Sequence, residues 1–339
     1  MGPRGRRQCR GRGPTKAGWV VVGGDGWAGC KEITHLPDSL FGLRHLQTLD
    51  IRGTSIVYIE LQKLQKLEYF RSGTTVPWKD DDGLAADEES TPLIISSCTL
   101  LPKFFRRGPV GPCNGVKVPR GIRHLKSLHT LGAINVNNSA GDILDDIYLL
   151  KQLKKLELSG INKKNSKKLS RAIINQKSLE SLSLQFGKEN HVVHWDDISP
   201  PSSIRSLKLY GHVVELSAMR FKNLQNLRKM SLEMTRLFTP DDIKLLARLF
   251  STLQNLEISC SSSLQLRFVE GAMEKLEQLN GSSLKVSGLK HLISLTQVWL
   301  EGTCDNTLKE ALLQKLVSHP KKPALKMKDS SAAGIVRRV

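Results

Sequence analysis

The chain has 339 residues, of which 39% are hydrophobic and only 5% aromatic. This length suits one large domain or two ordinary ones, and aliphatic side chains must supply most of the core. The net charge of +19 is spread along the chain and forms no clustered basic stripe. Spread charge favours solubility and weak attraction to polyanions. We therefore do not expect nucleic acid as the main partner.

The N-terminal apolar residues and the cysteines both indicate the cellular compartment of the protein. The longest N-terminal apolar run, Trp19–Val22, is too short for the core of a signal peptide or for a membrane span. The cysteines are scattered without a Cys-x-x-Cys pair, which favours free thiols in a reducing compartment over disulfides or a zinc site. They are Cys9, Cys30, Cys98, Cys113, Cys260 and Cys304. We expect a cytoplasmic protein that makes no membrane contact.

One pattern of aliphatic residues recurs along most of the chain. Its form, L-x-x-L-x-x-L-x-L, is clearest from Leu43 to Ile51, from Leu150 to Leu158 and from Phe250 to Ile258. Copies begin near positions 43, 64, 125, 150, 176, 201, 224, 250, 273 and 292. All but one of the steps between them span 19 to 26 residues, close to the period of roughly 20–29 residues of leucine-rich repeats. An ordinary amphipathic helix can produce one such copy but not this recurrence.

The end of each copy, L-x-L, has the period of two that is typical of a β-strand. Its leucines point towards the core, and the residues between and beside them point outwards. Because no single repeat can close its own core, successive repeats must stack. The sequence therefore predicts an α/β repeat fold, namely a leucine-rich-repeat solenoid of about ten repeats. We expect a curved horseshoe with a parallel β-sheet on its concave face.

The N-terminal boundary of this solenoid is predicted near residue 31. Residues 1–30 are rich in glycine and arginine and are expected to form a disordered basic segment. Residues 31–42 fit the return half of a repeat whose strand is missing. The leucine-rich-repeat domain, predicted at residues 31–320, therefore begins in mid-repeat and without an N-terminal cap.

Two further boundaries lie within and after the solenoid. The long step in the repeat contains an insertion at about residues 76–117, rich in Asp, Glu and Pro, which we interpret as a loop that leaves the solenoid. Alternatively, its apolar residues Leu93–Ile95 and Leu100–Leu101 belong to a degenerate repeat. Residues 305–318 have helical spacing and a plausible N-cap at Asp305, which predicts a capping helix. Residues 321–339 are expected to form a disordered tail.

Three short motifs resemble ligand sites but depart from the required spacing. In Gly24–Lys31, Cys30 separates the second glycine from the lysine, so the order of a phosphate-binding loop is absent. His191 and His194 have a spacing that would suit metal binding on a helix, but the following prolines indicate a solvated loop. Asp80–Gly83 lacks the alternating ligands of a calcium loop. We expect neither a cofactor nor a metal ion.

The lysine pairs at 163–164 and 167–168 form a short basic cluster. Such a cluster can serve as a localisation signal or contact phosphate, but a solvated return segment just after the strand that ends near Leu158 is the favoured interpretation. No arrangement of serine, cysteine or histidine indicates a nucleophile. We therefore expect that the protein is not an enzyme.

The amino-acid sequences of the repeats are similar to those of one protein family. The stretches LPDSLFGLRHLQTLDIRGTSI, VKVPRGIRHLKSLHTLGAINV, LKKLELSGINKKNSKKLSRAI, SLESLSLQFGK and LTQVWLEGTCDNTLKEALLQKLVSHPKKPALKM resemble the C-terminal leucine-rich-repeat domain of plant intracellular nucleotide-binding disease-resistance proteins. The resemblance is to the cereal coiled-coil type and covers about residues 31–328. The resemblance does not extend to the coiled-coil and nucleotide-binding modules, which lie upstream of the repeats in that family.

This resemblance implies a function in recognition. It implies the sensor domain of an immune receptor, which binds a pathogen effector or a host protein that an effector modifies, and which contacts the receptor's nucleotide-binding module. Without that module the chain is not expected to perform the nucleotide-driven switch alone. The alternative is a truncated receptor fragment, or a generic leucine-rich-repeat scaffold, without an independent role in defence.

The outward residues of the predicted strands are the candidate protein-binding residues of the concave face. They are Asp50, Arg52, Tyr69, Arg71, Lys155, Glu157, Lys208, Tyr210, Lys229, Glu233, Trp299 and Glu301. Arg52, Tyr210 and Trp299 are the strongest candidates by residue type, because binding hot spots favour Arg, Tyr and Trp. The alternative is that each is an ordinary solvated strand residue.

Overall fold

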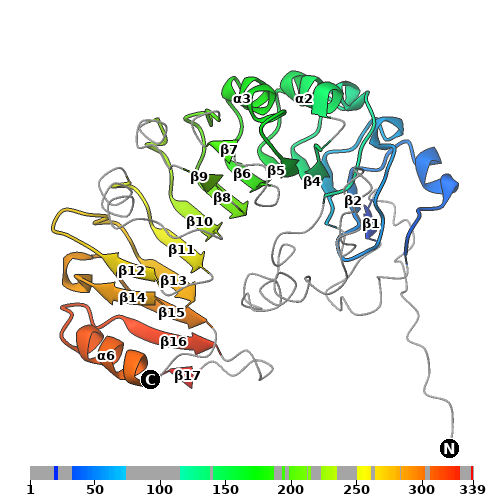
Figure 1. The fold of residues 1–339 in the computed structure, drawn as a ribbon. Coiled ribbons are helices and arrows are strands. Elements are labelled where there is room, and N and C mark those ends of the chain that lie inside the picture. Colours follow the sequence, from blue (N-terminus) through cyan, green and yellow to red (C-terminus); the bar gives the residue numbers. More distant parts are fainter. Residues whose placement is uncertain are drawn as a thin grey trace, which may run out of the picture.

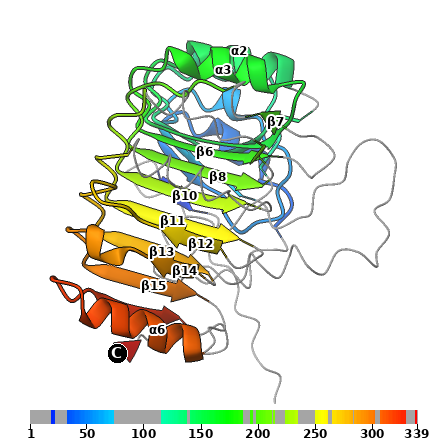
Figure 2. The ribbon, with the colours of Figure 1, turned by 60° about the vertical axis from the view of Figure 1, so that its left-hand side comes forward.

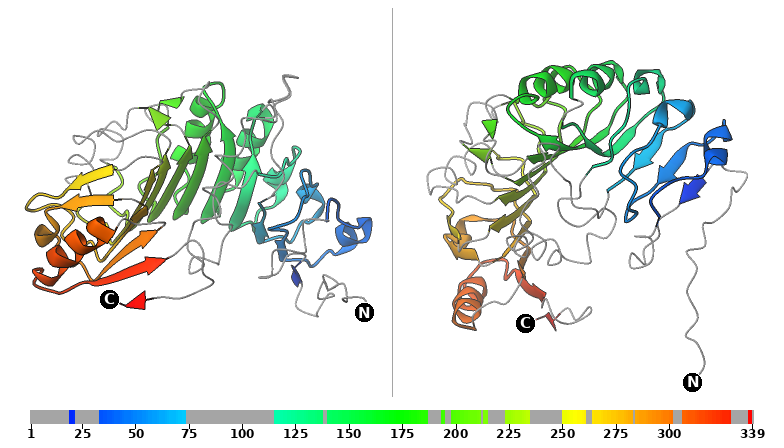
Figure 3. Two further views of the ribbon diagram at one scale, coloured as in Figure 1. Left: turned by 60° about the horizontal axis from the view of Figure 1, so that its bottom comes forward. Right: turned by 45° about the vertical axis from the view of Figure 1, so that its right-hand side comes forward.

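The computed structural model describes most of the repeat region as one curved, layered solenoid (Figure 1). Its described residues are 19–21, 33–73, 115–137, 140–186, 193–194, 198–211, 213–214, 223–234, 250–260, 264–282, 284–301, 306–328 and 337–338. Most strands line the inner side of the arc, and the helices lie on its outer side (Figures 1 and 3). The repeat pattern of the sequence thus corresponds to a physical stack.

A sheet of 13 strands runs the length of the stack in the order β1-β2-β3-β4-β5-β6-β8-β10-β11-β13-β15-β16-β17. All neighbours pair in parallel except β16 and β17, which are antiparallel. The strands are β1 (Trp19–Val21), β2 (Thr48–Asp50), β3 (Tyr69–Arg71), β4 (Thr130–Asn135), β5 (Lys155–Ile161), β6 (Ser181–Phe186), β8 (Ser206–Gly211), β10 (Lys229–Met234), β11 (Asn255–Cys260), β13 (Gln278–Ser282), β15 (Gln297–Glu301), β16 (Ala324–Lys328) and β17 (Arg337–Arg338).

The leucines of the repeat form ladders across this sheet. In one ladder Leu156, Leu182 and Leu207 lie side by side on β5, β6 and β8, and the ladder continues through Met230 and Leu256. Each of these five side chains is at most 2% exposed. One hydrophobic cluster extends from Leu40 to Leu325, because each repeat covers the open face of its neighbour.

The outer layer changes along the arc. Short 3-10 segments return the chain in the N-terminal repeats: η2 (Asp38–Gly42), η3 (Leu61–Lys63) and η5 (Ile122–His124). The α-helices α2 (Ala140–Leu149) and α3 (Ser166–Ile174) follow in the middle. The paired strands β12 (Leu264–Arg267) and β14 (Leu284–Ser287), η7 (Leu289–His291) and then α6 (Asn306–Val317) follow further on. A second short pair joins β7 (Val193–His194) and β9 (Val213–Val214).

Helix α3 shows why these segments form the outer layer. Its apolar residues Leu169, Ala172 and Ile173 are buried at the three- and four-residue spacing of one helical face, while Lys167 and Arg171 are exposed. Lys168 reaches Asp145 of α2 at 2.9 Å. The basic cluster at 163–168 therefore lies on a solvated return segment, as the sequence indicates.

The N-terminal end differs from the sequence prediction. The repeat at residues 31–42 was expected to lack its strand, but β1 pairs with β2 in parallel, with Trp19 opposite Thr48. Residues 19–21 thus belong to the sheet and not to a disordered segment. The rest of the predicted disordered segment, together with the glycine-rich motif at 24–31, lies outside the described residues. An L-x-x-L signature is absent from residues 1–30, which is why the repeat pattern did not indicate this strand.

The C-terminal end also differs. The predicted helix at 305–318 is present as α6, but it does not end the solenoid, because β16 follows it and pairs with β15 in parallel. Residues 324–328 are therefore a strand and not part of a disordered tail. Helix α6 is the return segment of a repeat, and its Leu312 and Leu316 are buried. Asp305, the predicted N-cap, lies outside the described residues.

Most of the predicted insertion lies outside the described residues, including the alternative repeat around Leu93–Leu101 and the acidic motif at 80–83. Its last residues return to the solenoid. Val116 forms a parallel bridge with Ile134, and Lys117 forms one with Tyr58. The repeat therefore resumes just before residue 117, slightly earlier than the sequence indicates. Among the described helices, none is long and apolar enough to cross a membrane.

Candidate interaction surface on the concave sheet

The face of the sheet opposite the leucine ladders carries a continuous row of side chains. Registered pairs place its members next to one another on successive strands from β5 to β16. These residues, which we call the central row, are Glu157, Ser183, Lys208, Ser231, Glu257, Asn280, Trp299 and Lys326. Figure 2 shows the strands from β6 to β15 stacked in this order. Neighbouring strands lie about 4.8 Å apart, so the row gives one polar surface to which all these repeats contribute.

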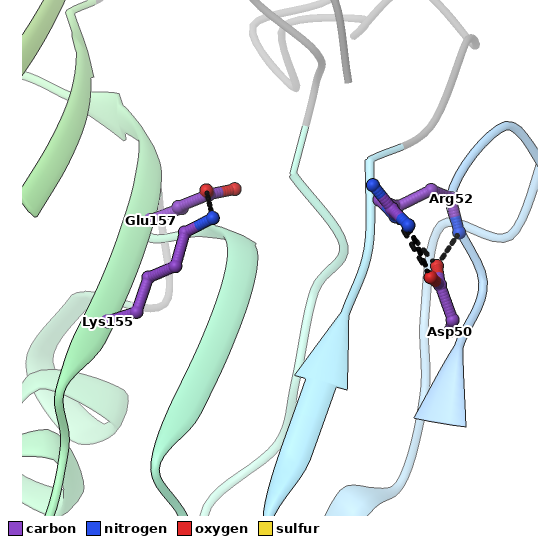
Figure 4. A network of polar contacts seen from close by, with 4 residues as sticks. All are labelled: Asp50, Arg52, Lys155 and Glu157. Carbon is purple, nitrogen blue, oxygen red and sulfur yellow. Dashed lines mark hydrogen bonds and ion pairs between the residues drawn. The ribbon is translucent and has the colours of Figure 1, made fainter. Parts of the chain in front are cut away.

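Asp50 and Arg52, at the N-terminal end of this surface, form a nearly buried ion pair (Figure 4). The Arg52 Nε lies 2.8 Å from Asp50 Oδ1, and its Nη2 lies 2.5 Å from Oδ2. Only 14% of the Arg52 side chain and 9% of the Asp50 side chain are exposed. This arrangement differs from the sequence prediction of an outward anchor: the Arg52 guanidinium already has a carboxylate partner and little exposed surface.

Tyr69 and Arg71, on β3, are exposed as predicted. The Tyr69 ring stacks on the His129 ring, with 5.8 Å between the centroids. This contact holds the tyrosine against the neighbouring repeat and leaves 37% of the residue exposed. Both side chains are accessible to a partner.

Lys155 and Glu157 lie two residues apart on β5 and point to the same side (Figure 4). The Lys155 Nζ lies 2.8 Å from Glu157 Oε1. Both side chains are partly exposed, so the pair contributes little to stability, as is typical of solvated ion pairs. It presents one cation and one anion to any partner of β5.

The strands β8 and β10 carry a group of cations at the ends where they begin. Lys229 is exposed and Lys208 is half-buried. Arg205 and Arg228 immediately precede the two strands, are exposed, and were not among the predicted residues. Because they stand one position before the L-x-L strand, extending the candidate set by one residue on the N-terminal side of each strand would have found them.

Glu233, near the end of β10, lies in an environment that disfavours its charge. Burial, and secondarily the nearby charge of Glu257, raise the pKa of the Glu233 carboxyl to about 7. Its Oε2 atom is buried and has no hydrogen-bond partner among the described residues. The sequence prediction placed Glu233 on this face but could not indicate that it would be desolvated.

Glu257 and Asn280 also belong to this surface but were not predicted as binding residues. Glu257 occupies the x position of an L-x-L strand, as Glu157 does, and Asn280 follows Leu279 at the same register although Gly281 replaces the last leucine. Counting the residue after the third aliphatic position of every repeat would have included both. Asn280 is only 5% exposed, and its Oδ1 lacks a hydrogen-bond partner among the described residues. Glu257 lies directly opposite it on β11.

Trp299 is the centre of a small cluster at the C-terminal end of the row. Its Nε1–H donates to Gln297 Oε1 at 3.1 Å, and Lys326 Nζ donates to the same oxygen at 3.0 Å. The Lys326 ammonium also lies 4.6 Å from the centre of the Trp299 ring, a cation–π distance. Strand β16, which the sequence analysis placed in a tail, therefore supplies the residue that orients Trp299. Of Glu301 only the backbone position on β15 is described.

The described residues contain no cluster of three potential metal ligands. His194 lies on β7, whereas His191 is outside the described residues. Tyr210, the remaining predicted anchor, is half-buried on β8 and opposes Glu233 of β10. The arrangement of the described residues suits recognition of another molecule by many weak, distributed contacts.

Comparison with known proteins finds a match to one family model in the middle of the chain. The family model for the leucine-rich repeat region matches residues 112–259, and no curated protein matches. Among solved structures, internalin C2 from Listeria monocytogenes is 17% identical, with coverage of 61% of this chain and 90% of its own and a TM-score of 0.35. A leucine-rich-repeat protein of Leptospira interrogans is 15% identical, with coverage of 88% and 94% and a TM-score of 0.23.

A third structure is the complex of TLR13 with ssRNA13, which is 13% identical. The match covers 76% of this chain and 43% of the TLR13 chain, with a TM-score of 0.34. Identities and TM-scores this low carry no argument about this chain. The matched repeat region and the registered parallel sheet agree with the repeat period of the sequence. The chain therefore carries a leucine-rich-repeat domain with the solenoid fold, a domain type that serves protein interaction.

Proposed function

We propose that the chain is a non-enzymatic recognition module of plant immunity, with its concave sheet as the binding surface. The observation that carries this proposal is the central row, in which successive strands present side chains to one side while the leucine ladders pack on the other. Such a surface binds by distributed contacts and can diverge in sequence without loss of the core. The resemblance of the repeats to cereal disease-resistance proteins supports the role in defence.

The proposed partner is a protein in the cytoplasm. It is a pathogen effector, a host protein that an effector modifies, or the nucleotide-binding module of a receptor. Tyr210 and Trp299 are the proposed aromatic anchors, because half-buried aromatic side chains dominate the energy of many interfaces. Arg52 is not proposed as an anchor, since its guanidinium is paired and nearly buried.

The test is calorimetric titration of the purified chain with purified candidates of these three kinds. Once one binds, Tyr210→Ala and Trp299→Ala are each expected to weaken it at least about tenfold, the loss typical of a hot spot. The matched control is Tyr148→Ala, a change of an exposed tyrosine on the outer helix α2. Unchanged affinity in both concave variants, or an equal loss in the control, would reject the concave surface.

The cations of β8 and β10 favour a second candidate function, the binding of a polyanion. Arg205, Arg228 and Lys229 are exposed at the same edge of the sheet. Binding to phosphates falls steeply with salt, because each contact releases a counterion. A salt titration therefore distinguishes the two functions. Binding to a polyanion collapses between roughly 50 and 200 mM salt. Retention of most of the affinity over this range supports protein recognition.

A third possibility is a fragment or scaffold without a defence function. It predicts that none of the three kinds of candidate binds. Binding of a nucleotide-binding module alone would instead indicate that the chain acts as part of a receptor.

A further inference from the structure

Four polar side chains on the neighbouring strands β8 and β10 (Figure 2) form a compact square on the concave side of the sheet. Ser206 lies opposite Lys229, and Lys208 lies opposite Ser231. The two lysines thus occupy one diagonal of the square, and the two serines occupy the other. We call these four residues the donor square.

The burial pattern of the two strands shows that the donor square lies on one accessible face. Leu207 and Met230, which separate its members along each strand, are buried in the leucine ladder. Lys229 is exposed, and the other three residues are partly exposed. Because a strand alternates its faces at every residue, all four side chains point to the concave side, where a partner can reach them.

Every member of the donor square can donate hydrogen bonds: three from each lysine ammonium and one from each serine hydroxyl. Among the described residues, none of the four side chains has a hydrogen-bond or ion-pair partner. With strands about 4.8 Å apart and about 3.3 Å per residue, the Cα atoms of Lys208 and Lys229 are roughly 8 Å apart. Their flexible four-carbon stems can bring both ammonium groups to one small anion above the two serines.

Carboxylates border the donor square on three sides. Along the central row, Glu157 and Glu257 each stand two strands away from Lys208. At the ends of the strands, Glu233 lies two residues beyond Ser231 on β10. A polymer of phosphates that followed the row or the strands would meet these carboxylates. The donor square is therefore suited to one compact anion and not to a chain of anions.

The fourth side of the donor square is basic. Arg205 and Arg228 are exposed directly before β8 and β10, and they are neighbours, since the Arg228 N–H donates to the Arg205 carbonyl oxygen at 2.9 Å. Together with Lys208 and Lys229 they place four positive charges around one pair of strands. This is more than a carboxylate can use with its single charge. A phosphorylated side chain carries about −1.5 to −2 charge at pH 7 and three strong acceptor oxygens.

We propose that the donor square binds one phosphorylated side chain of the protein partner, with both lysine ammonium groups and both serine hydroxyls donating to the phosphate oxygens. This proposal rests on the protein-recognition function proposed above and specifies a modification of the partner. It differs from the binding of a polyanion, because the square holds a single phosphate between bordering carboxylates. The phosphorylation state of the partner then controls its affinity for the concave sheet.

The test uses a pentapeptide with one phosphoserine between pairs of glycines as the probe, and the same peptide with serine or aspartate at the centre as controls. Each peptide is titrated into the whole chain at pH 7, and the backbone amides of Ser206 and Ser231 are followed by NMR. The phosphorylated peptide is expected to shift both signals saturably. It is expected to bind about tenfold or more tightly than the aspartate peptide, as the additional charge and acceptor oxygen imply. Equal affinity of these two peptides, or an absence of saturation, overturns the proposal.

Variants separate the donor square from general attraction to positive charge. Lys208→Gln and Lys229→Gln are each expected to weaken binding of the phosphorylated peptide about tenfold, the effect of losing one charge-assisted contact. The double variant Ser206→Ala, Ser231→Ala keeps both charges and is expected to weaken binding by a similar factor, because two hydrogen bonds to a charged group are lost. The control Lys154→Gln removes an exposed cation just before β5 and is expected to leave the affinity unchanged. An equal loss in the control, or no loss in the serine variant, would reject the donor square.

A thymidine decanucleotide tests whether a polymer of phosphates binds instead. It is expected to bind no more tightly than the phosphorylated peptide, because the bordering carboxylates repel the phosphates that follow the first. Tighter binding that shifts amides from β5 to β11 together, and that falls steeply between roughly 50 and 200 mM salt, would indicate a polyanion surface and overturn the proposal.

The outcome for the donor square is distinguishable from that for the proposed function. If a protein partner depends on Tyr210 and Trp299, but binds equally well after phosphatase treatment and to the Lys208→Gln variant, the phosphate site is wrong and the recognition surface stands. If the phosphorylated peptide saturates the donor square but no protein candidate binds, the phosphate site stands and the proposed partner is wrong.

Discussion

Replacement of Glu233 by glutamine should stabilise the protein, although it removes a charged residue from its surface. The Glu233 carboxyl is desolvated and close to Glu257, and its pKa is raised from 4.5 to about 7 in the folded protein. Glutamine keeps the shape of the side chain without the charge. The variant therefore isolates the free energy of ionising this carboxyl inside the fold.

The sign of the effect follows from proton linkage. A carboxyl with a raised pKa binds its proton more tightly in the folded than in the unfolded state, so ionisation opposes folding. The penalty is small near pH 4.5, grows as pH rises towards about 7, and is constant above that. At about 1.36 kcal/mol for each pH unit between the two pKa values, the full penalty is roughly 3 kcal/mol. Between pH 5 and pH 8 the difference between variant and wild type should grow by about 2–3 kcal/mol.

The assay is urea unfolding of both proteins, followed by circular dichroism at pH 5, 6, 7 and 8. Groups that do not interact with Glu233 contribute equally to both proteins, so the difference between their free energies of unfolding reports this residue together with its repulsion of Glu257. Glu277→Gln serves as the control and should change stability by less than about 0.5 kcal/mol at every pH, because its side chain is exposed. Parallel pH curves for Glu233→Gln and wild type would refute the claim that the carboxyl is desolvated.

Two further predictions concern the core and the N-terminal ion pair. Leu207→Ala removes a fully buried side chain from the ladder between β6 and β10 and should lower the free energy of unfolding by about 2–5 kcal/mol; in urea denaturation a cost below about 0.5 kcal/mol would contradict the repeat assignment. Asp50→Ala leaves the Arg52 guanidinium nearly buried without its carboxylate and should cost about 3 kcal/mol. The double variant Asp50→Ala, Arg52→Met should recover much of that loss, and simple additivity of the two changes would show that the pair contributes no coupling.

The spacing of the leucines predicted most of the solenoid because it is a local signal. A strand alternates its faces every residue, so Leu156 and Leu158 must share one face and Glu157 must point to the other, whatever lies in the neighbouring repeats. The equal length of most repeats then aligns strand with strand. The predicted helix at 305–318 is likewise local, since it depends only on the spacing of its own leucines.

Elements without that spacing were recognisable only in the assembled stack. Strands β1 and β16 carry no full L-x-x-L-x-x-L-x-L pattern. They are strands because β2 and β15 offer unpaired backbone groups at the two ends of the sheet, and pairing satisfies those groups. A segment that covers an open end needs only a compatible backbone, so its sequence can be ordinary.

The same distinction between local and tertiary information applies to the residues of the candidate surface. The sequence by itself determined which side chains face away from the leucines, including those of Lys208, Glu233 and Trp299, because the period of two decides the face. Only the tertiary structure decided their surroundings: the burial of Arg52 beside Asp50, the desolvation of Glu233, and the unpaired oxygen of Asn280. Exposure and charge on a curved sheet depend on residues one or two strands away, some twenty-five positions distant in the chain by the period of this repeat class, and no local pattern contains that information.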